Sequence, residues 1–408
     1  MGQITNQGVG ASNLRMSRPS RHLRIFAFLF AFLLVWDLGV SAGPATGVAK
    51  GAAAKTAAAK RPGVAKSAVK KPASTKTTKK RNVSRYGVPT FADSAKDDVT
   101  EFDDPLVREV AVRALGRYNG SVVAIDPNTG RILSIVNQGL AFSSGFIPCS
   151  TIKPVIAVAA LQENVITRDT MIRVTRRRYM NLTEAMAHSN NNFFEELGRR
   201  MGFDIVASYA RMLGLGELAG YNLAEEHPGT LPSEAPEHGG VARMSSFGEG
   251  IKITPLQLGA LAGALANGGT LYYLQYPRSE EEKQAFAPRV KRELKIESLL
   301  PEVRDGMLAA VLYGTARQSY DPEGEQALGK TGTCSDPSSR LGWYVSYADQ
   351  VHPRIVLVVL MRGQSRRVKG PTAAIIAGHI YRGLREHNYF AEAPRPAGSS
   401  SSIGNSLH

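Results

Sequence analysis

The chain has 408 residues, 43% of them hydrophobic, so it can bury one large core or two ordinary ones. Its net charge of +15 arises at the N-terminal end: residues 43–81 carry eleven Lys or Arg and no acid, and residues 1–42 carry four Arg and one Asp. Residues 82–408 are left nearly neutral, so their charge does not indicate a nucleic-acid-binding domain and gives no information about a substrate.

An apolar segment at residues 25–36 predicts export from the cytoplasm. Four arginines precede it: Arg15, Arg18, Arg21 and Arg24. A segment this short, followed by small residues at 40–42, is typical of a cleaved signal peptide. Counted on to residue 40 it nearly spans a bilayer, so we expect residues 25–42 to be an uncleaved anchor and residues 1–24 a basic cytoplasmic segment. The rest of the chain would lie in the cell envelope outside the cytoplasm, or be secreted if the signal is cleaved.

Residues 43–81 are a low-complexity mixture of Ala, Lys, Pro and Thr, and we expect a disordered linker. We interpret this linker first as a spacer between the membrane and the domain. The alternative is a polycation that contacts anionic lipid or wall polymers. DNA binding would need a cytoplasmic location, which the export signal contradicts, so no nucleic-acid partner is expected. Residues 82–392 are the predicted folded domain, and residues 393–408, rich in Pro and Ser, a disordered tail.

The folded part begins with a helix and a hairpin. Apolar spacing predicts an amphipathic helix over residues 104–118. Residues 121–126 and 132–136 are typical of strands, and the turn at 127–130, which contains Pro127 and Gly130, joins them into a hairpin.

The remaining elements alternate between helix and strand. Helices are predicted over residues 181–213, 256–266, 301–316 and 371–385. Strands are predicted over residues 328–334, 341–348 and 354–362. This pattern alone indicates a mixed α/β or α+β domain.

Ser150 and Lys153 form a candidate nucleophile and base. They lie three residues apart, directly before an apolar run at 155–161 that predicts a buried helix, so both side chains would share one face at its first turn. The free N–H groups and the helix dipole favour negative charge there. An ordinary helix start is the alternative, because Ser is a common N-cap.

Two later motifs favour the catalytic interpretation. They are Ser189-Asn190-Asn191 and Lys330-Thr331-Gly332-Thr333. In this order the three motifs resemble those of penicillin-binding proteins and class A β-lactamases. Further stretches resemble landmarks of the penicillin-binding transpeptidase domain: residues 126–130, 254–258, 267–269 and 314–316. The resemblance covers about residues 86–390 and implies a five-stranded, mainly antiparallel sheet with flanking helices and a helical subdomain.

The resemblance also implies roles for these residues. Ser150 would attack the carbonyl of a D-Ala-D-Ala peptide bond or a β-lactam and form an acyl-enzyme. Lys153 would take the serine proton, held neutral by desolvation and by the second cation, Lys330. Ser189 would pass a proton to the leaving nitrogen, and Asn191 would bond the substrate amide and Lys153.

Lys330 would hold the substrate carboxylate together with Thr331 and Thr333, while Gly332 lets the backbone approach the ligand. By the same resemblance, the oxyanion hole would be the backbone N–H groups of Ser150 and Thr333. No metal or organic cofactor is expected, since no His or Cys shows ligand spacing.

The implied function is a serine D,D-transpeptidase of cell-wall synthesis that binds peptidoglycan stem peptides and β-lactams. A β-lactamase, a D,D-carboxypeptidase and a non-catalytic penicillin-binding sensor or scaffold stay open as alternatives. Ser150 and Ser189 are only 39 residues apart. That spacing is shorter than expected for a typical transpeptidase, so we expect a trimmed helical subdomain and an altered acceptor cleft.

The chain's two cysteines, Cys149 and Cys334, adjoin the first and third motifs. If Ser150 and Thr333 serve one oxyanion, their neighbours lie close together, and a disulfide is geometrically plausible. The placement resembles the class A carbapenem-hydrolysing β-lactamases, in which a disulfide joins these positions, and an exported chain meets oxidising conditions. The alternative is a pair of buried thiols.

Overall fold

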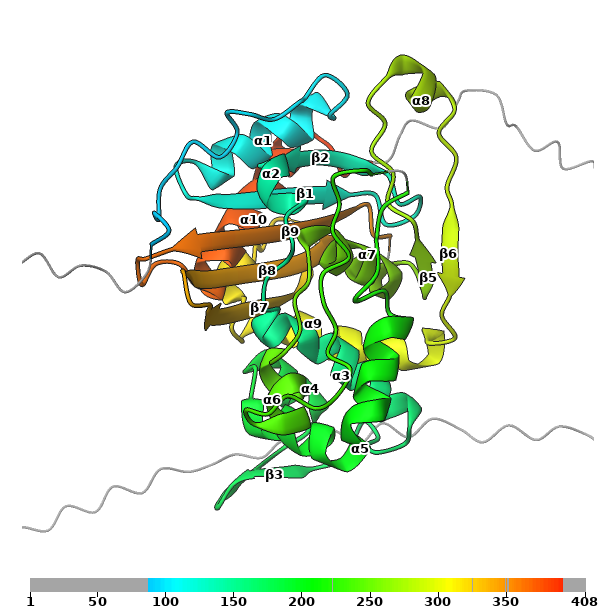
Figure 1. Ribbon diagram of the computed structural model, residues 1–408, viewed down its shortest axis with the longest axis vertical. Coiled ribbons are helices and arrows are strands. Elements are labelled where there is room, and N and C mark those ends of the chain that lie inside the picture. Colours follow the sequence, from blue (N-terminus) through cyan, green and yellow to red (C-terminus); the bar gives the residue numbers. More distant parts are fainter. Residues whose placement is uncertain (1–86, 222, 325, 349, 351, 392–408) are drawn as a thin grey trace, which may run out of the picture. The chain divides into compact units, whose positions relative to one another are not determined.

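The computed structural model describes residues 87–391 apart from four positions: Asn222, Glu325, Asp349 and Val351 (Figure 1). The expectations for the anchor, the basic linker and the C-terminal tail fall outside these residues. Within the described part, no helix is both long and apolar enough to cross a membrane.

A five-stranded sheet forms the centre of the described fold (Figure 1). Its strands, in spatial order, are β2 (Ile132–Val136), β1 (Gly120–Ile125), β9 (Ile355–Gly363), β8 (Arg340–Ala348) and β7 (Leu328–Ser335). Each neighbouring pair is antiparallel. The predicted fold class is therefore confirmed, and all five predicted strands form within two residues of their expected ends.

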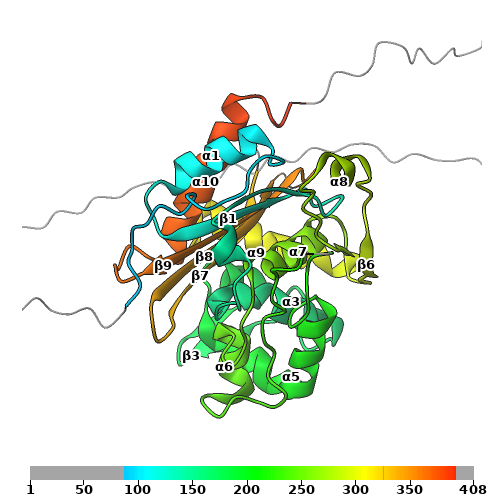
Figure 2. The ribbon, with the colours of Figure 1, turned by 45° about the horizontal axis from the view of Figure 1, so that its top comes forward.

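Both faces of the sheet are buried. Successive side chains of a strand point to opposite faces, and on each face they pack into a separate core. On β9, Val356 and Val358 belong to one core, while Leu357 and Val359 belong to the other. The second core is covered by α1 (Pro105–Leu115) and α10 (Gly370–Glu386), which lie on the same side of the sheet (Figure 2). A strand buried on both faces reads as one apolar run, as β9 does.

Two predicted helices end earlier than expected. α1 stops at Leu115 because Gly116 has φ +56°, a non-helical backbone conformation that glycine adopts without strain. α9 (Leu300–Leu312) is likewise shorter than the predicted 301–316. Its last part is a turn, in which the N–H of Thr315 donates to Ala187 O.

A helical subdomain packs against the other face of the sheet. It contains α3 (Lys153–Gln162), α4 (Leu182–Ala187), α5 (Asn191–Met212) and α6 (Gly240–Phe247). The predicted helix over 181–213 is divided into α4 and α5 by a loop at Ser189 and Asn190. This break places the second motif, as described below.

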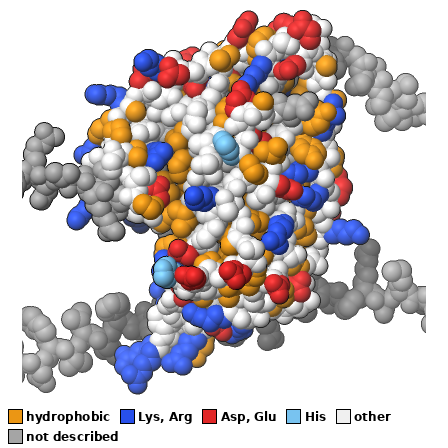
Figure 3. All heavy atoms as spheres, in the orientation of Figure 1, with side chains coloured by type: hydrophobic (Ala, Val, Ile, Leu, Met, Phe, Trp, Pro, Cys, Tyr) orange, Lys and Arg blue, Asp and Glu red, His pale blue; other side chains and the backbone are white. Residues whose placement is uncertain are grey.

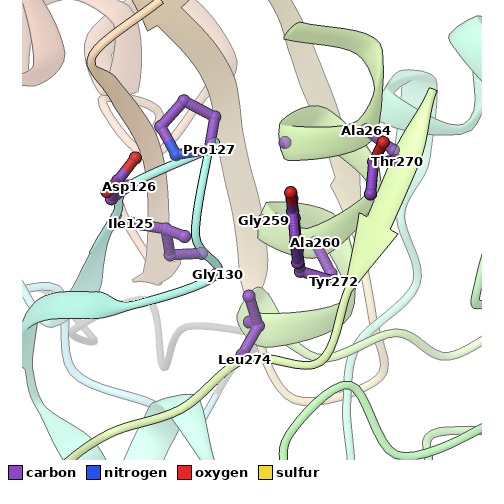
Figure 4. A pocket seen from close by; sticks show the side chains of 11 residues that line it. Ile125, Asp126, Pro127, Gly130, Gly259, Ala260, Ala264, Thr270, Tyr272 and Leu274 are labelled. Carbon is purple, nitrogen blue, oxygen red and sulfur yellow. The ribbon is translucent and has the colours of Figure 1, made fainter. Parts of the chain in front are cut away.

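α7 (Pro255–Ala266) joins the subdomain side to the sheet. Thr254 and Gln257 form a capping box at its start, and all its residues are buried. Gly259 lies against Ile125 of β1 (Figure 4). The space between α7, the 126–130 turn and β5 (Thr270–Tyr272) measures only about 10 Å³. It could hold about one water, so it is too small for a ligand.

Several short elements escaped sequence analysis. Two are antiparallel strand pairs: β3 (Ile172–Thr175) with β4 (Arg178–Met180), and β5 (Thr270–Tyr272) with β6 (Val290–Glu293). The others are α2 (Gln138–Ala141), α8 (Glu280–Gln284) and the 3-10 turns η2 (Glu297–Leu299) and η3 (Arg317–Ser319). Segments of three to five residues are too short to show a period.

Charged side chains of both signs are interspersed over the face in Figure 3. Lys and Arg gather at its lower end, where β3 and β4 lie in Figure 1. Three consecutive arginines, Arg176, Arg177 and Arg178, are exposed in that hairpin. Apart from this hairpin, the mixed charges on this face agree with the nearly neutral charge expected of the folded part.

Candidate active site

Ser150 lies in a single 3-10 turn, η1 (Cys149–Ile152), that leads directly into α3. Lys153 is the first residue of α3, and its backbone N–H donates to Ser150 O. Ser150 is 8% exposed, and its hydroxyl makes no hydrogen bond to any residue within the described part. The serine therefore stands at a helix start as expected, with its hydroxyl uncommitted.

Lys153 is fully buried, and its ammonium nitrogen has three oxygen partners. Nζ lies 2.7 Å from Ser189 O, 3.0 Å from Ser189 Oγ and 2.7 Å from Asn191 Oδ1. The ring of Phe194 lies 5.3 Å from the same nitrogen. A residue at the start of α3 is thus tied to the loop before α5.

Lys330 reaches the same hydroxyl from the sheet. It lies on β7, the edge strand, and is fully buried. Its Nζ donates to Ser189 Oγ at 2.8 Å and to Thr331 O at 2.8 Å. Ser189 Oγ therefore lies between two lysine nitrogens that come from distant parts of the sequence.

The environment lowers the pKa of both lysines. Burial lowers the pKa of Lys153 well below its usual value, and the nearby charge of Lys330 lowers it further, while Glu195 opposes this. Burial lowers the pKa of Lys330 to about 7. A neutral amine, which can accept a proton, is therefore accessible near neutral pH.

The position of Ser189 depends on a local backbone turn. Ser189 has φ +53°, in the left-handed region that few non-glycine residues adopt. Asn190 then caps α5, with its Oδ1 accepting from the N–H of Phe193 at 3.0 Å, so Asn191 becomes the first residue of α5. This turn directs the hydroxyl of Ser189 and the amide of Asn191 toward Lys153.

Gly332 allows β7 to lie against the nucleophile turn. A Cβ at this position would lie 3.0 Å from Pro148 O and 3.1 Å from Thr151 Cγ2. Most side chains would therefore push the strand and the turn apart. The close approach brings Thr333 to the level of η1, as an oxyanion hole built from Ser150 and Thr333 requires.

The two threonines of β7 make contacts that sequence analysis did not foresee. Thr331 Oγ1 lies 2.6 Å from Thr315 Oγ1, and Thr333 Oγ1 accepts from the N–H of Gly370 at 2.8 Å. Thr333 is exposed, whereas Thr331 is 4% exposed. The start of α10 and the turn after α9 thus fix the two hydroxyls.

Cys149 and Cys334 are joined by a disulfide, with their Cα atoms 5.6 Å apart. The bond links the residue before the nucleophile to the residue after Thr333. It therefore holds the two backbone segments that would carry the oxyanion hole.

Glu195 is a further charged residue near the site. It raises the pKa of Lys153 and accepts from Ser246 Oγ at 3.4 Å. It follows Asn191 by four residues on α5, so the two share a helix face. That spacing is the sequence signal that could have identified it.

His188 does not join the lysine cluster. Its side chain is 42% exposed, pairs with Glu184 at 3.4 Å and lies against the ring of Tyr313. Among the residues that the structure describes, no group of three or more His, Cys, Asp or Glu side chains could hold a metal ion.

Comparison with known proteins agrees with this geometry. The family model for the penicillin binding protein transpeptidase domain matches residues 120–382. Stage V sporulation protein D of Bacillus subtilis is 28% identical over 312 residues, covering 64% of this chain and 48% of that protein. Peptidoglycan D,D-transpeptidase MrdA of Acinetobacter baumannii is 26% identical over 351 residues, covering 67% and 51%. The chain thus spans about half the length of these curated relatives.

A solved structure shares the fold. The D,D-transpeptidase domain of a peptidoglycan glycosyltransferase from Eggerthella lenta superposes with a TM-score of 0.59 at 21% identity, covering 70% of this chain and 82% of that one. The family model covers well over half of the chain and includes all three motifs. The chain therefore belongs to the penicillin-binding protein transpeptidase family.

Proposed function

We propose that this chain is a serine D,D-transpeptidase that acts on peptidoglycan stem peptides ending in D-Ala-D-Ala. The convergence of Lys153 and Lys330 on Ser189 Oγ, beside an uncommitted Ser150, carries this proposal. The names of the relatives support it, since several are peptidoglycan D,D-transpeptidases.

Lys153 is suited to act as the base. A neutral lysine amine has two N–H donors and one lone pair. Its three partners are two oxygens that only accept, Ser189 O and Asn191 Oδ1, and one hydroxyl that can donate, Ser189 Oγ. The two acceptor oxygens can take both N–H groups of the neutral amine, which leaves its lone pair to accept a proton.

In the acylation step, Ser150 Oγ loses its proton to Lys153 Nζ and forms a bond to the carbonyl carbon of the penultimate D-Ala. The backbone N–H groups of Ser150 and Thr333 stabilise the oxyanion, each by a few kcal/mol. The C–N bond then breaks, and the leaving amine receives the proton through Ser189.

The second half restores the serine. An amine of another stem peptide attacks the ester carbonyl, a new C–N bond forms, and the proton that this amine loses returns to Ser150 Oγ. In the first half, Lys330 holds the carboxylate of the departing D-Ala, together with the hydroxyls of Thr331 and Thr333. The proton and the acyl group are thus balanced over the two half-reactions.

Position in the cell envelope completes the proposal. We propose that residues 25–42 anchor the protein and that residues 43–81 extend the domain from the membrane, where the linker can contact anionic lipid or wall polymers. The apolar segment, the arginines before it and the polycationic composition support this arrangement.

The decisive experiment supplies an acyl donor peptide ending in D-Ala-D-Ala together with an amine acceptor, and measures products by mass spectrometry. Transfer to the amine is expected to exceed hydrolysis. Hydrolysis alone would establish a D,D-carboxypeptidase, and release of a penicillin adduct within seconds would establish a β-lactamase. Penicillin binding without transfer or hydrolysis of the donor peptide would establish a non-catalytic sensor or scaffold.

A further inference from the structure

A cavity of about 620 Å³ lies beside the nucleophile turn. One wall is the segment before that turn, including Phe146 and Ile147, and another is the β7–β8 turn, including Ser335 and Ser338. Ile147 is connected to the catalytic region, because its carbonyl accepts from Trp343 Nε1 at 3.0 Å. The disulfide joins the residues just inside these two walls, so the cavity begins where the candidate active site ends.

The charges that line this cavity are unequally compensated. Asp336 accepts from the N–H and hydroxyl groups of Ser338 and Ser339, and Glu249 is paired with Arg243 at 3.2 Å. Both carboxylates are therefore already engaged. The two cations that line the cavity, Arg362 and Lys252, are not engaged in this way: neither forms an ion pair with any residue that the structure describes.

Arg362 is placed to receive an anion. Its guanidinium lies 5.0 Å from the centre of the Phe146 ring and, among the described residues, donates only to Ser338 Oγ, at 3.3 Å. Its Nε is buried and has no partner among the described residues. Its terminal N–H groups make one hydrogen bond among the described residues, and a carboxylate could engage two guanidinium donors at once.

The acyl part of the donor peptide, as it would lie along β7, leads toward this cavity. Under the proposed function, Lys330 and Ser189 serve the leaving D-Ala, and the oxyanion forms at Thr333. The acyl part then extends past Thr333 along β7, toward Ser335. Strand residues rise about 3.3 Å each, so the β7–β8 turn lies opposite the residues two to three positions before the scissile bond.

We propose that this cavity binds the upstream part of the acyl donor and that Arg362, assisted by Lys252, selects donors that carry a carboxylate there. This inference rests on the proposed function. It assigns Arg362 a role in specificity, through contact with a substrate group remote from the reacting carbonyl.

The test compares two donor peptides that both end in D-Ala-D-Ala and differ only in an upstream side-chain carboxylate, free in one and amidated in the other. The wild type is expected to prefer the free carboxylate about tenfold in kcat/KM, mainly through KM. Arg362→Met is expected to bring the ratio near one by slowing the carboxylate peptide selectively. Lys252→Met, at an exposed position, is expected to lower it in part.

Arg289→Met is the matched control, because Arg289 also lies over an aromatic ring, that of Tyr221, outside the cavity. It should keep the wild-type ratio. No preference in the wild type, or an unchanged ratio in both Arg362→Met and Lys252→Met, would overturn the inference. If Arg362→Met does not fold, the ratio in Lys252→Met decides. Failure of wild-type Ser150 to react with benzylpenicillin would instead refute the proposed function.

Discussion

Lys153 and Lys330 share one oxygen: their Nζ atoms lie 3.0 and 2.8 Å from Ser189 Oγ. Both lysines are fully buried, so a second positive charge there is costly. The pair therefore favours loss of a proton, which Lys153 needs in order to act as a base.

Replacing the proposed base tests this arrangement. Lys153→Met should lower the second-order rate of acylation by a fluorescent penicillin by about 10²- to 10⁴-fold, because general base catalysis contributes about that much. Lys283→Met, at an exposed lysine of α8, is the control and should react normally. A Lys153→Met rate within a few-fold of wild type would show that another group takes the proton.

Stability should depend on pH through Lys330. Its pKa is about 7 in the folded protein and about 10.4 in an unfolded chain. Between these values the unfolded state binds more protons, so the free energy of unfolding should rise with pH from about 7 to about 10.4, by up to about 1.4 kcal/mol per pH unit. Urea unfolding of wild type and Lys330→Met across this range should show a smaller slope for the variant. Equal slopes would contradict the lowered pKa.

Gly332 should tolerate no side chain. Gly332→Ala is expected to cost about 1–3 kcal/mol of stability and to slow acylation, since the added Cβ meets Pro148 O at 3.0 Å. Gly87→Ala, where a Cβ meets nothing within 4 Å, is the control. Thermal unfolding and penicillin acylation measured on both would check this, and an acylation rate equal to wild type would argue against close contact between β7 and η1.

Four of the five strands, β1, β2, β8 and β9, were predictable because each is a mainly apolar run, whereas β7 is mostly Gly, Lys and Thr. The break at Ser189 was not predicted, because helical apolar spacing continues on both sides of it and the turn depends on a left-handed residue and an Asn190 cap. Motif order identified Ser150, Lys153 and Lys330 as candidates. The resemblance implied that they share a site. The convergence of Lys153 and Lys330 on the Ser189 hydroxyl could not be read from the sequence, since it depends on how the sheet and subdomain pack. The sequence assigned no role to Thr315 and Gly370, because each makes its contact with a different element that is distant in the sequence.

The disulfide should stabilise the folded chain. In the loop-entropy model, closing a loop with a sequence separation of 185 residues contributes roughly 5 kcal/mol, less any strain. Cys149→Ser with Cys334→Ser should lose a large part of this in denaturant unfolding. The pairing itself is checked by thiol titration of denatured, unreduced protein folded under oxidising conditions, in which two free thiols would rule the bond out.

Intact-mass spectrometry after incubation with benzylpenicillin shows directly whether Ser150 is an acylatable nucleophile. We expect a gain of one penicillin mass per chain, located by peptide mapping at Ser150, and no gain in Ser150→Ala. The adduct should persist for many minutes. A wild type that gains no mass, or a Ser150→Ala variant that still gains it, would show that Ser150 is not the nucleophile.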